Sequence, residues 1–253
     1  MQHQFPFGEP LRRVQQTDRA PKKVFVLGVY ASAVHARWIG PDDQQVVKAL
    51  AVASEPYIFW RGEGAAEIIK QIAVPPELGR LEPADALFNG PSGLALDKLI
   101  LQPLGLKRDQ AWLCDLVPHS CLNNRQNKAI EDRYAPLAKE LGMPAASIPR
   151  VPEILADDAR RQEILAELRE SQATTLILLG DQPIKWFLHG FAPQWQSLAD
   201  FEPYGRLHPL EIEGLKLNVL PLAHLRQAAM LGQHSPEWYQ AHQQWLAQAS
   251  KRL

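Results

Sequence analysis

The side chains in this sequence that could do chemistry follow or interrupt runs of apolar residues. Tyr30 closes the apolar run 24–30, Asp115 lies inside the run 111–117, and His224 comes just after the run that ends at residue 222. An imidazole can donate or accept a hydrogen bond near neutral pH, whereas an ionised aspartate only accepts, and an aromatic ring can stack on a flat ligand. The chemistry on offer is therefore hydrogen bonding and stacking.

The elements that must position these side chains alternate between strand and helix patterns. Continuous apolar runs bounded by turns are typical of buried parallel strands, and a spacing of three to four residues indicates helices. The expected strands are 24–30, 46–53 (where a helix is also possible), 111–117, 174–179 and a hairpin at 210–217 whose second arm runs on to His224. The expected helices are 65–74, 92–101 (capped by Ser92), 126–141, 157–171, 184–189 (capped by Asp181) and 236–246.

This alternation predicts an α/β fold with a mainly parallel sheet that is covered by helices on both sides. Ligands of such sheets bind beyond the carboxyl ends of the strands. The rule selects four places in the sequence. They are the turn after Tyr30, the segment 115–124, the turn after Gly180, and His224.

Composition sets the broad class of protein. The chain has 253 residues, of which 46% are hydrophobic and 22% charged, as expected for one large folded core. We expect residues 1–22 to form an N-terminal arm and 23–253 a single domain, in a monomer. No signal peptide is visible and no apolar stretch approaches about 18 residues, so we expect a cytoplasmic protein without membrane contact.

Several common functional motifs are absent. Gly28 stands alone after the first strand, without the glycine pattern of dinucleotide sites, and the Walker A, H-E-x-x-H and G-x-S-x-G patterns are missing. Cys114 and Cys121 are too few for a four-cysteine cluster and too far apart for a close-spaced metal pair. We therefore expect buried cysteines, no metal and no cofactor.

Four segments, taken in order, carry a resemblance to a known family. They are 28–32 (GVYAS), 88–93 (FNGPSG), 112–118 (WLCDLVP) with 123–125 (NNR) after it, and 220–227 (LPLAHLRQ). In this order they resemble the motifs of the uracil-DNA glycosylase superfamily, and the resemblance covers most of the chain from residue 24 to 231. The resemblance rests on the order of the four motifs in a chain that alternates between strand and helix patterns.

The resemblance implies a single three-layer α/β/α domain around a short, mainly parallel sheet. It also implies an extruded DNA base bound at the strand ends and hydrolysis of its N-glycosidic bond, as in base-excision DNA repair. Tyr30 and Ser32 would position or activate water. Gly28, Phe88 and Asp115 would bind the base, with Phe88 stacked on its face and Asp115 at its edge.

The last motif of the resemblance would supply the groups for the leaving base and the DNA. His224 would stabilise the departing base, which gains negative charge as the bond breaks. Leu225 and Arg226 would enter the DNA minor groove, where an apolar wedge fills the gap left by the extruded nucleotide. Asn124 and Arg125 would add further contacts to DNA.

The sequence departs from the family pattern at three places. Tyr30 and Ala31 stand where an acidic residue or asparagine and a proline are usual, and Leu225 stands where proline is common. Asp115 replaces the usual asparagine that contacts the base edge. Because an ionised aspartate only accepts hydrogen bonds, we expect an atypical or damaged base with donor groups, unless the pKa of Asp115 is strongly raised.

Structural interpretations stand beside these roles. His224 could be a partly buried, hydrogen-bonded histidine, Phe88 a core residue, and Asp115 the partner of Arg125 in a salt bridge. Leu225 could be a core residue at a helix start, Arg226 a solvated charge, and the segment 123–125 an ordinary helix start capped by asparagine.

The charge balance limits the expected partners. A formal net charge of -1 argues against bulk binding of nucleic acid but allows a local basic rim, so DNA contact should be local and salt-sensitive. Two other functions stay open: a catalytically inactive module that binds nucleic acid or nucleotides, and an enzyme acting on a nucleobase-containing small molecule. Around the last motif the charged and histidine side chains are Arg206, His208, Glu211, Glu213, Lys216, His224, Arg226 and His234.

Overall fold

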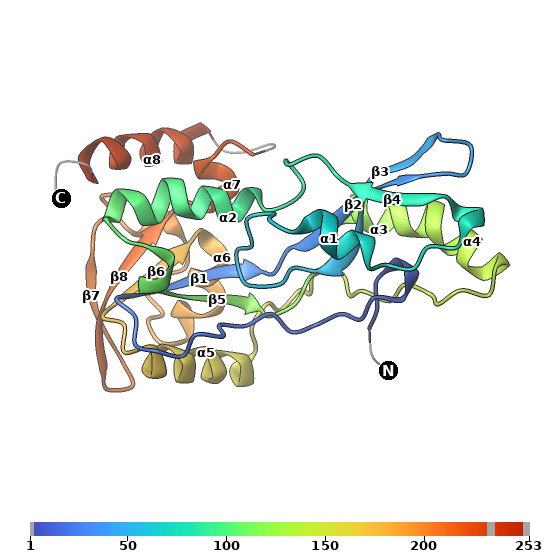
Figure 1. Cartoon of the computed structure of the whole chain (residues 1–253). Coiled ribbons are helices and arrows are strands. Elements are labelled where there is room, and N and C mark those ends of the chain that lie inside the picture. The colour runs from blue at the N-terminus through green and yellow to red at the C-terminus, as the bar shows by residue number, and fades with distance from the viewer. Residues whose placement is uncertain (1–2, 232–235, 250–253) are drawn as a thin grey trace. The chain divides into compact units, whose positions relative to one another are not determined.

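The computed structural model describes residues 3–231 and 236–249, and their contacts divide the chain into two compact units (Figure 1). His234 lies outside the described residues. We name the units after their sheets. The five-stranded unit comprises residues 15–29, 94–117 and 154 onward; the three-stranded unit comprises the residues up to 14, 30–93 and 118–153.

A mixed sheet forms the centre of the five-stranded unit, in the order β5-β1-β6-β8-β7. β1 pairs in parallel with β6 and β6 with β8, whereas β7 is antiparallel to β8. The arrows of β1 and β5 point the same way in Figure 1. The prediction of an α/β fold with a mostly parallel sheet is confirmed. The strands are β1 (Val24–Tyr30), β5 (Ala111–Val117), β6 (Thr175–Leu179), β7 (His208–Ile212) and β8 (Leu215–Leu222).

The sequence explains these strands directly. Every residue of β5 and the first five residues of β1 are buried, so neither strand needs the apolar–polar alternation of a half-exposed sheet. Glu213 and Gly214 join β7 to β8 with φ angles of 45° and 80°. Positive φ at both central residues suits a two-residue hairpin turn, and the expected hairpin is confirmed.

Helices cover this sheet. α5 packs against β5 and α6 against β6, and Figure 1 shows α8 on one side of the sheet and α5 on the other. Asp157 caps α5 by accepting a hydrogen bond from the Arg160 amide at 2.9 Å. The helices are α2 (Pro91–Leu96), which continues into a π-helical turn (Asp97–Leu101), α5 (Asp158–Ser171), α6 (Asp181–Trp186), α7 (Leu225–Ala228) and α8 (Pro236–Ala249).

The three-stranded unit has its own antiparallel sheet, in the order β3-β2-β4. Phe7 contacts Trp38 and Tyr134 edge to face, at ring-centroid distances of 5.6 and 5.1 Å. Phe5 and Phe7 come from the segment expected as an arm, and both are buried in this core. The elements are β2 (Ala33–Ile39), β3 (Gln45–Ser54), β4 (Arg80–Pro83), α1 (Ala65–Lys70), α3 (Asn124–Ala129), a π-helical turn (Ile130–Tyr134) and α4 (Ala135–Glu140).

Three local expectations need correction. β2 was not expected, because His35 and Arg37 interrupt its apolar residues. Ser92 is not a cap: α2 begins at Pro91, whose fixed φ suits the first turn of a helix. Asp181 does not cap α6 either, since Gly180 holds that position and the Asp181 carboxylate accepts from the Leu198 amide at 2.8 Å. No helix in the described ranges is long and apolar enough to cross a membrane.

Candidate functional site

Gly28, Asp115 and His224 all belong to the carboxyl side of the five-stranded sheet. Gly28 and Asp115 are each the fifth of seven residues, in β1 and β5, and His224 follows the end of β8. β1 lies between β5 and β6 although it precedes both in the chain. In open α/β sheets, ligands bind at such a point, where the direction of the strand order changes.

The imidazole of His224 is held in one tautomer by its own helix. His224 is the N-cap of α7, and its Nδ1 accepts a hydrogen bond from the Arg226 amide at 3.3 Å. A nitrogen that accepts a hydrogen bond carries no proton, so the proton of the neutral ring lies on Nε2. Nε2 is therefore the atom of His224 that can donate to a ligand oxygen.

Gly180 allows His224 to lie close to the end of β6. Gly180 has a φ of +85°, and its amide donates to the Leu222 carbonyl at 2.8 Å. A Cβ at position 180 would lie 2.8 Å from the Cβ of His224. Gly180, predicted as a turn at the end of a strand, is thus also required by the packing of the histidine.

Asp115 is buried, with 3% of its surface exposed. Burial raises the pKa of its carboxyl from 3.8 to about 7, although the positive charge of Arg160 opposes this rise. Near neutral pH the protonated and ionised forms of Asp115 therefore coexist. The condition under which Asp115 could donate a hydrogen bond, a strongly raised pKa, is met.

Arg160 of α5 was not considered from the sequence and is the cation beside Asp115. Its guanidinium donates to the backbone carbonyl oxygens of Asp115 and Leu116, at 2.7 and 2.9 Å, and pairs with Glu163 at 2.8 Å. These bonds fix the backbone of β5 rather than neutralise the Asp115 carboxylate. The helix pattern of 157–171 gave no signal that an arginine would reach into the strand.

Tyr30 is the last residue of β1, but its contacts group it with Ser32 and Phe88 in the three-stranded unit. The structure therefore does not by itself bring these three residues to Asp115 and His224. Tyr30 and Ser32 are half-buried, and the Ser32 carbonyl accepts a hydrogen bond from the Ser120 hydroxyl. That Tyr30, Ser32 and Phe88 join the site of the five-stranded unit stays a prediction.

Phe88 is half-buried in a loop that is fixed by hydrogen bonds and packing against other segments of the same unit. Its ring lies 6.4 Å from the ring of His35, and the Lys48 ammonium lies 5.6 Å from its centroid. The Asn89 side chain accepts from the His35 amide at 2.8 Å and donates to the His35 carbonyl at 2.9 Å. Gly90 and Gly93 pack against the backbone of residues 59–62, so packing alone explains these two glycines of the motif.

Asn124 and Arg125 begin α3, as the structural interpretation predicted. Asn123 is the cap, and its side chain accepts from the amides of Arg125 and Gln126, both at 3.0 Å. Arg125 also lines a shallow hollow of about 280 Å³ together with Lys128, Arg133, Asp132 and an apolar floor of Val46, Val47 and Ala129.

The segment after His224, which forms α7 and the turn that follows it, exposes a different apolar side chain from the expected one. Leu225 is 1% exposed, which favours its interpretation as a core residue at a helix start. Arg226 is exposed. Met230, two residues beyond α7, is 57% exposed and has a φ of 50°, which is unusual for a residue other than glycine.

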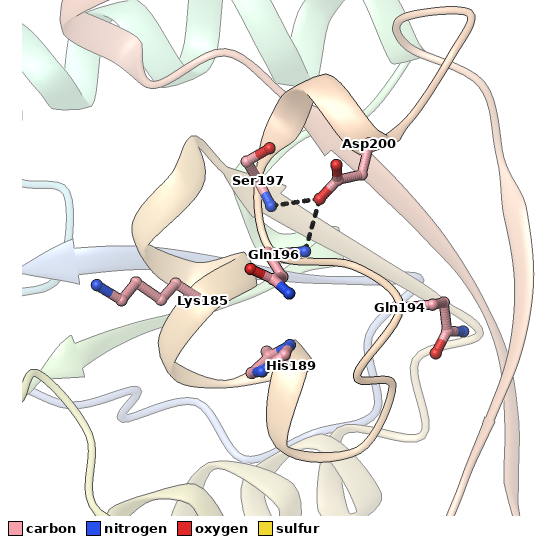
Figure 2. Close-up of a pocket in the computed structure, with 6 residues that line it drawn as sticks. All are labelled: Lys185, His189, Gln194, Gln196, Ser197 and Asp200. Carbon is pink, nitrogen blue, oxygen red and sulfur yellow. Dashed lines mark hydrogen bonds between the residues drawn. The ribbon is translucent and has the colours of Figure 1, made fainter.

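A polar hollow of about 600 Å³ lies beside α6 and contains none of the predicted site residues (Figure 2). The Asp200 carboxylate there already accepts hydrogen bonds from the backbone amides of Gln196 and Ser197, at 2.7 and 2.8 Å. Figure 2 shows the side chains of Lys185 and Gln194 on opposite sides of the group that lines the hollow, pointing in different directions. Because its side chains do not converge, we do not assign a ligand to it.

Cys114 and Cys121 are both buried, as expected, and burial raises the pKa of each thiol. Within residues 3–231 and 236–249, no three His, Cys, Asp or Glu side chains come together as a metal site.

No known family model matches the chain, and no curated protein matches it. The site therefore has to be interpreted from its own geometry.

Proposed function

We propose that this chain is a DNA glycosylase-like protein of three-layer α/β/α architecture, similar to the uracil-DNA glycosylase superfamily. It binds an extruded base at the carboxyl edge of the five-stranded sheet and hydrolyses the N-glycosidic bond of that base. The ordered motifs of the sequence support this proposal. So does the strand order, because Gly28 in β1 and Asp115 in the neighbouring β5 lie at the switch point.

The tautomer of His224 is the observation that carries the proposal. Breaking the C1′–N bond leaves its electron pair on the base, and water supplies the new bond to C1′. A hydrogen-bond donor aimed at a base oxygen stabilises the developing negative charge. With Nδ1 bonded to the Arg226 amide, the neutral ring of His224 offers such a donor at Nε2.

Asp115 is proposed to contact the edge of the base, and its burial changes the expected specificity. When protonated, its carboxyl offers one donor and one acceptor, like the amide of an asparagine, and suits a uracil-like edge. When ionised, it only accepts and suits an edge with N–H donors. Since burial raises the pKa to about 7, base preference should change with pH around neutrality.

A catalytically inactive nucleic-acid-binding module is the second candidate. Tyr30, which stands where an acidic residue or asparagine usually orients water, carries no carboxylate, and Ala31, which stands where a proline is usual, is 1% exposed. Ser32 is the remaining polar side chain of that motif. A protein of this kind would bind an extruded base without cleaving its bond.

The decisive experiment incubates the purified chain with single- and double-stranded oligonucleotides that each carry one uracil or one damaged purine. The incubations are run at pH 6 and at pH 8, and abasic sites are then detected by strand cleavage with alkali. We expect product from at least one oligonucleotide and its loss in His224→Ala. His189→Ala is the control, because His189 is also half-buried in the five-stranded unit but bonds to the Trp195 carbonyl.

The other outcomes separate the candidate functions. Tight DNA binding without abasic sites at either pH would favour the inactive binding module. Turnover of free nucleosides with none on DNA would favour an enzyme for nucleobase-containing small molecules. Equal cleavage by wild type and His224→Ala would contradict the role of His224.

A further inference from the structure

A chain of hydrogen bonds connects the peptide just before His224 to two helical segments of the five-stranded unit. The Ala223 amide donates to the Tyr204 hydroxyl oxygen at 2.8 Å, and that oxygen lies 2.7 Å from Nδ1 of His242 in α8. Nε2 of His242 lies 3.1 Å from the carbonyl oxygen of Leu99, in the π-helical turn after α2. Neither Tyr204 nor His242 was singled out from the sequence.

The direction of each bond follows from its two ends. The Ala223 amide can only donate, and the Leu99 carbonyl can only accept. Nε2 of His242 therefore carries the ring proton, and Nδ1 accepts the proton of the Tyr204 hydroxyl. Burial lowers the pKa of His242 to about 4, so its ring is neutral and these directions hold at physiological pH.

The residues packed around this series of hydrogen bonds restrict the movement of its side chains. His242 is fully buried, and its ring centroid lies 5.1 Å from that of Trp245. The indole N–H of Trp245 donates to the Gly205 carbonyl at 3.1 Å, so the backbone next to Tyr204 is held as well. The carbonyl end of the Leu222–Ala223 peptide is held too, because the Gly180 amide donates to the Leu222 carbonyl at 2.8 Å.

We propose that Tyr204 and His242 are positioning residues for His224. They hold the Ala223 peptide, and so they set the direction in which Nε2 of His224 points. This inference rests on the proposed function, in which His224 donates to the leaving base. Without the Tyr204 hydroxyl, the Ala223 amide loses its acceptor and the turn into α7 can rotate.

The test is Tyr204→Phe in the full chain, followed by NMR of ¹⁵N-labelled histidine. In the wild type we expect the Nε2–H tautomer for both His224 and His242. In Tyr204→Phe we expect His224 to show a mixture of both tautomers. On the DNA substrate identified above, kcat should fall about tenfold while KM stays unchanged, as for a misdirected reacting group.

Tyr134→Phe is the matched control. The Tyr134 hydroxyl also accepts from one backbone amide, that of Phe7 at 2.9 Å, and donates to one carbonyl, that of Pro144 at 2.8 Å, but it lies in the three-stranded unit. It should lose comparable stability and leave the signals of His224 unchanged. A general loss of stability therefore cannot produce the expected result.

Several outcomes would overturn the inference. One is an unchanged His224 tautomer in Tyr204→Phe. If that variant does not fold, His242→Gln takes its place with the same readout. In the wild type alone, an Nδ1–H tautomer at His242 would contradict the chain of bonds. Failure of the proposed function is seen separately, as wild-type protein that cleaves no substrate while the tautomer signals still report on positioning.

Discussion

The Cα of Gly180 faces the Cβ of His224 so closely that a methyl group at position 180 would lie 2.8 Å from it. Gly180 also has a φ of +85° and a ψ of -173°, a combination that is essentially restricted to glycine. Gly180→Ala should therefore lower the free energy of unfolding by about 2–4 kcal/mol through strain and steric overlap. It should also displace His224, and urea unfolding together with the histidine NMR signals measures both effects.

Gly214→Ala separates the effect of backbone strain from the effect of steric overlap with His224. Gly214 has a φ of +80° in the same unit, but nothing lies within 4 Å of the position of its added Cβ. It should lose only the smaller, conformational part of the stability, about 1 kcal/mol. Equal losses in the two variants would mean that the contact with His224 contributes nothing.

Asp115→Asn should stabilise the protein at pH 8 and leave it almost unchanged at pH 4. Burial raises the pKa of Asp115 from 3.8 to about 7, so between these values the folded chain holds a proton that the unfolded chain has lost. Stability therefore falls as the pH rises through this window, by about 4 kcal/mol in total. An amide does not ionise, so the variant lacks this loss.

Urea unfolding of wild type and Asp115→Asn at pH 4, 6 and 8 checks this prediction. The difference between the two proteins should grow with pH and level off above about pH 7. A difference independent of pH would show that Asp115 stays ionised in the folded protein. The same variant should lose the pH dependence of base preference that the wild type is expected to have.

His35 should not be protonated until well below neutral pH. Burial lowers its pKa from 6.5 to about 4, and its Nε2 lies 2.8 Å from the side-chain nitrogen of Gln126, which donates to it. The unfolded chain binds a proton first as the pH falls, so His35 should remove about 3 kcal/mol of stability between pH 6.5 and 4. An NMR titration in which the His35 signals move with a midpoint near 6.5 would contradict this.

The sequence predicted the parts of this structure that depend on continuous local patterns. β1 and β6 are almost entirely apolar, and β5 is apolar except for Asp115. The hairpin at Gly214 carries its own turn residue, so each of these elements was predictable from a few neighbours. β2 was missed because His35 and Arg37 interrupt it, yet His35 is buried through hydrogen bonds to Asn89 and Gln126, which are distant in sequence.

The sequence predicted where the candidate site lies along the chain but not the contacts within it. The position of His224 after a strand indicated a site, and the turn at Gly180 indicated another. The tautomer of His224, the raised pKa of Asp115 and the bonds of Tyr204 all depend on contacts between residues far apart in the chain. No local pattern reports such contacts.

Met230→Ala should weaken binding to DNA that carries an extruded base and leave stability unchanged within about 0.5 kcal/mol. Met230 is exposed two residues beyond α7, the helix that His224 caps, and methionine is among the apolar side chains that fill gaps between bases. Fluorescence of 2-aminopurine beside the target base measures extrusion. Leu207→Ala, at a similarly exposed residue of the same unit (55%), should have no effect, and equal effects would contradict the assignment.

Arg125 and Lys128 should contact DNA phosphates if the three-stranded unit takes part in binding. In the described part of this unit, Arg37, Lys48, Arg61, Arg80 and Arg150 each pair with a carboxylate, whereas Arg125, Lys128 and Arg133 have no ion-pair partner and surround one hollow. Each phosphate contact changes the slope of log affinity against log salt by about 0.9. Arg125→Ala and Lys128→Ala should therefore each lower the steepness of this slope by about that amount, as measured by fluorescence anisotropy between 50 and 200 mM salt. Lys70→Ala, which removes an exposed cation of the same unit outside the hollow, should leave the slope unchanged, and a slope that is the same in all four proteins would place DNA elsewhere on the chain.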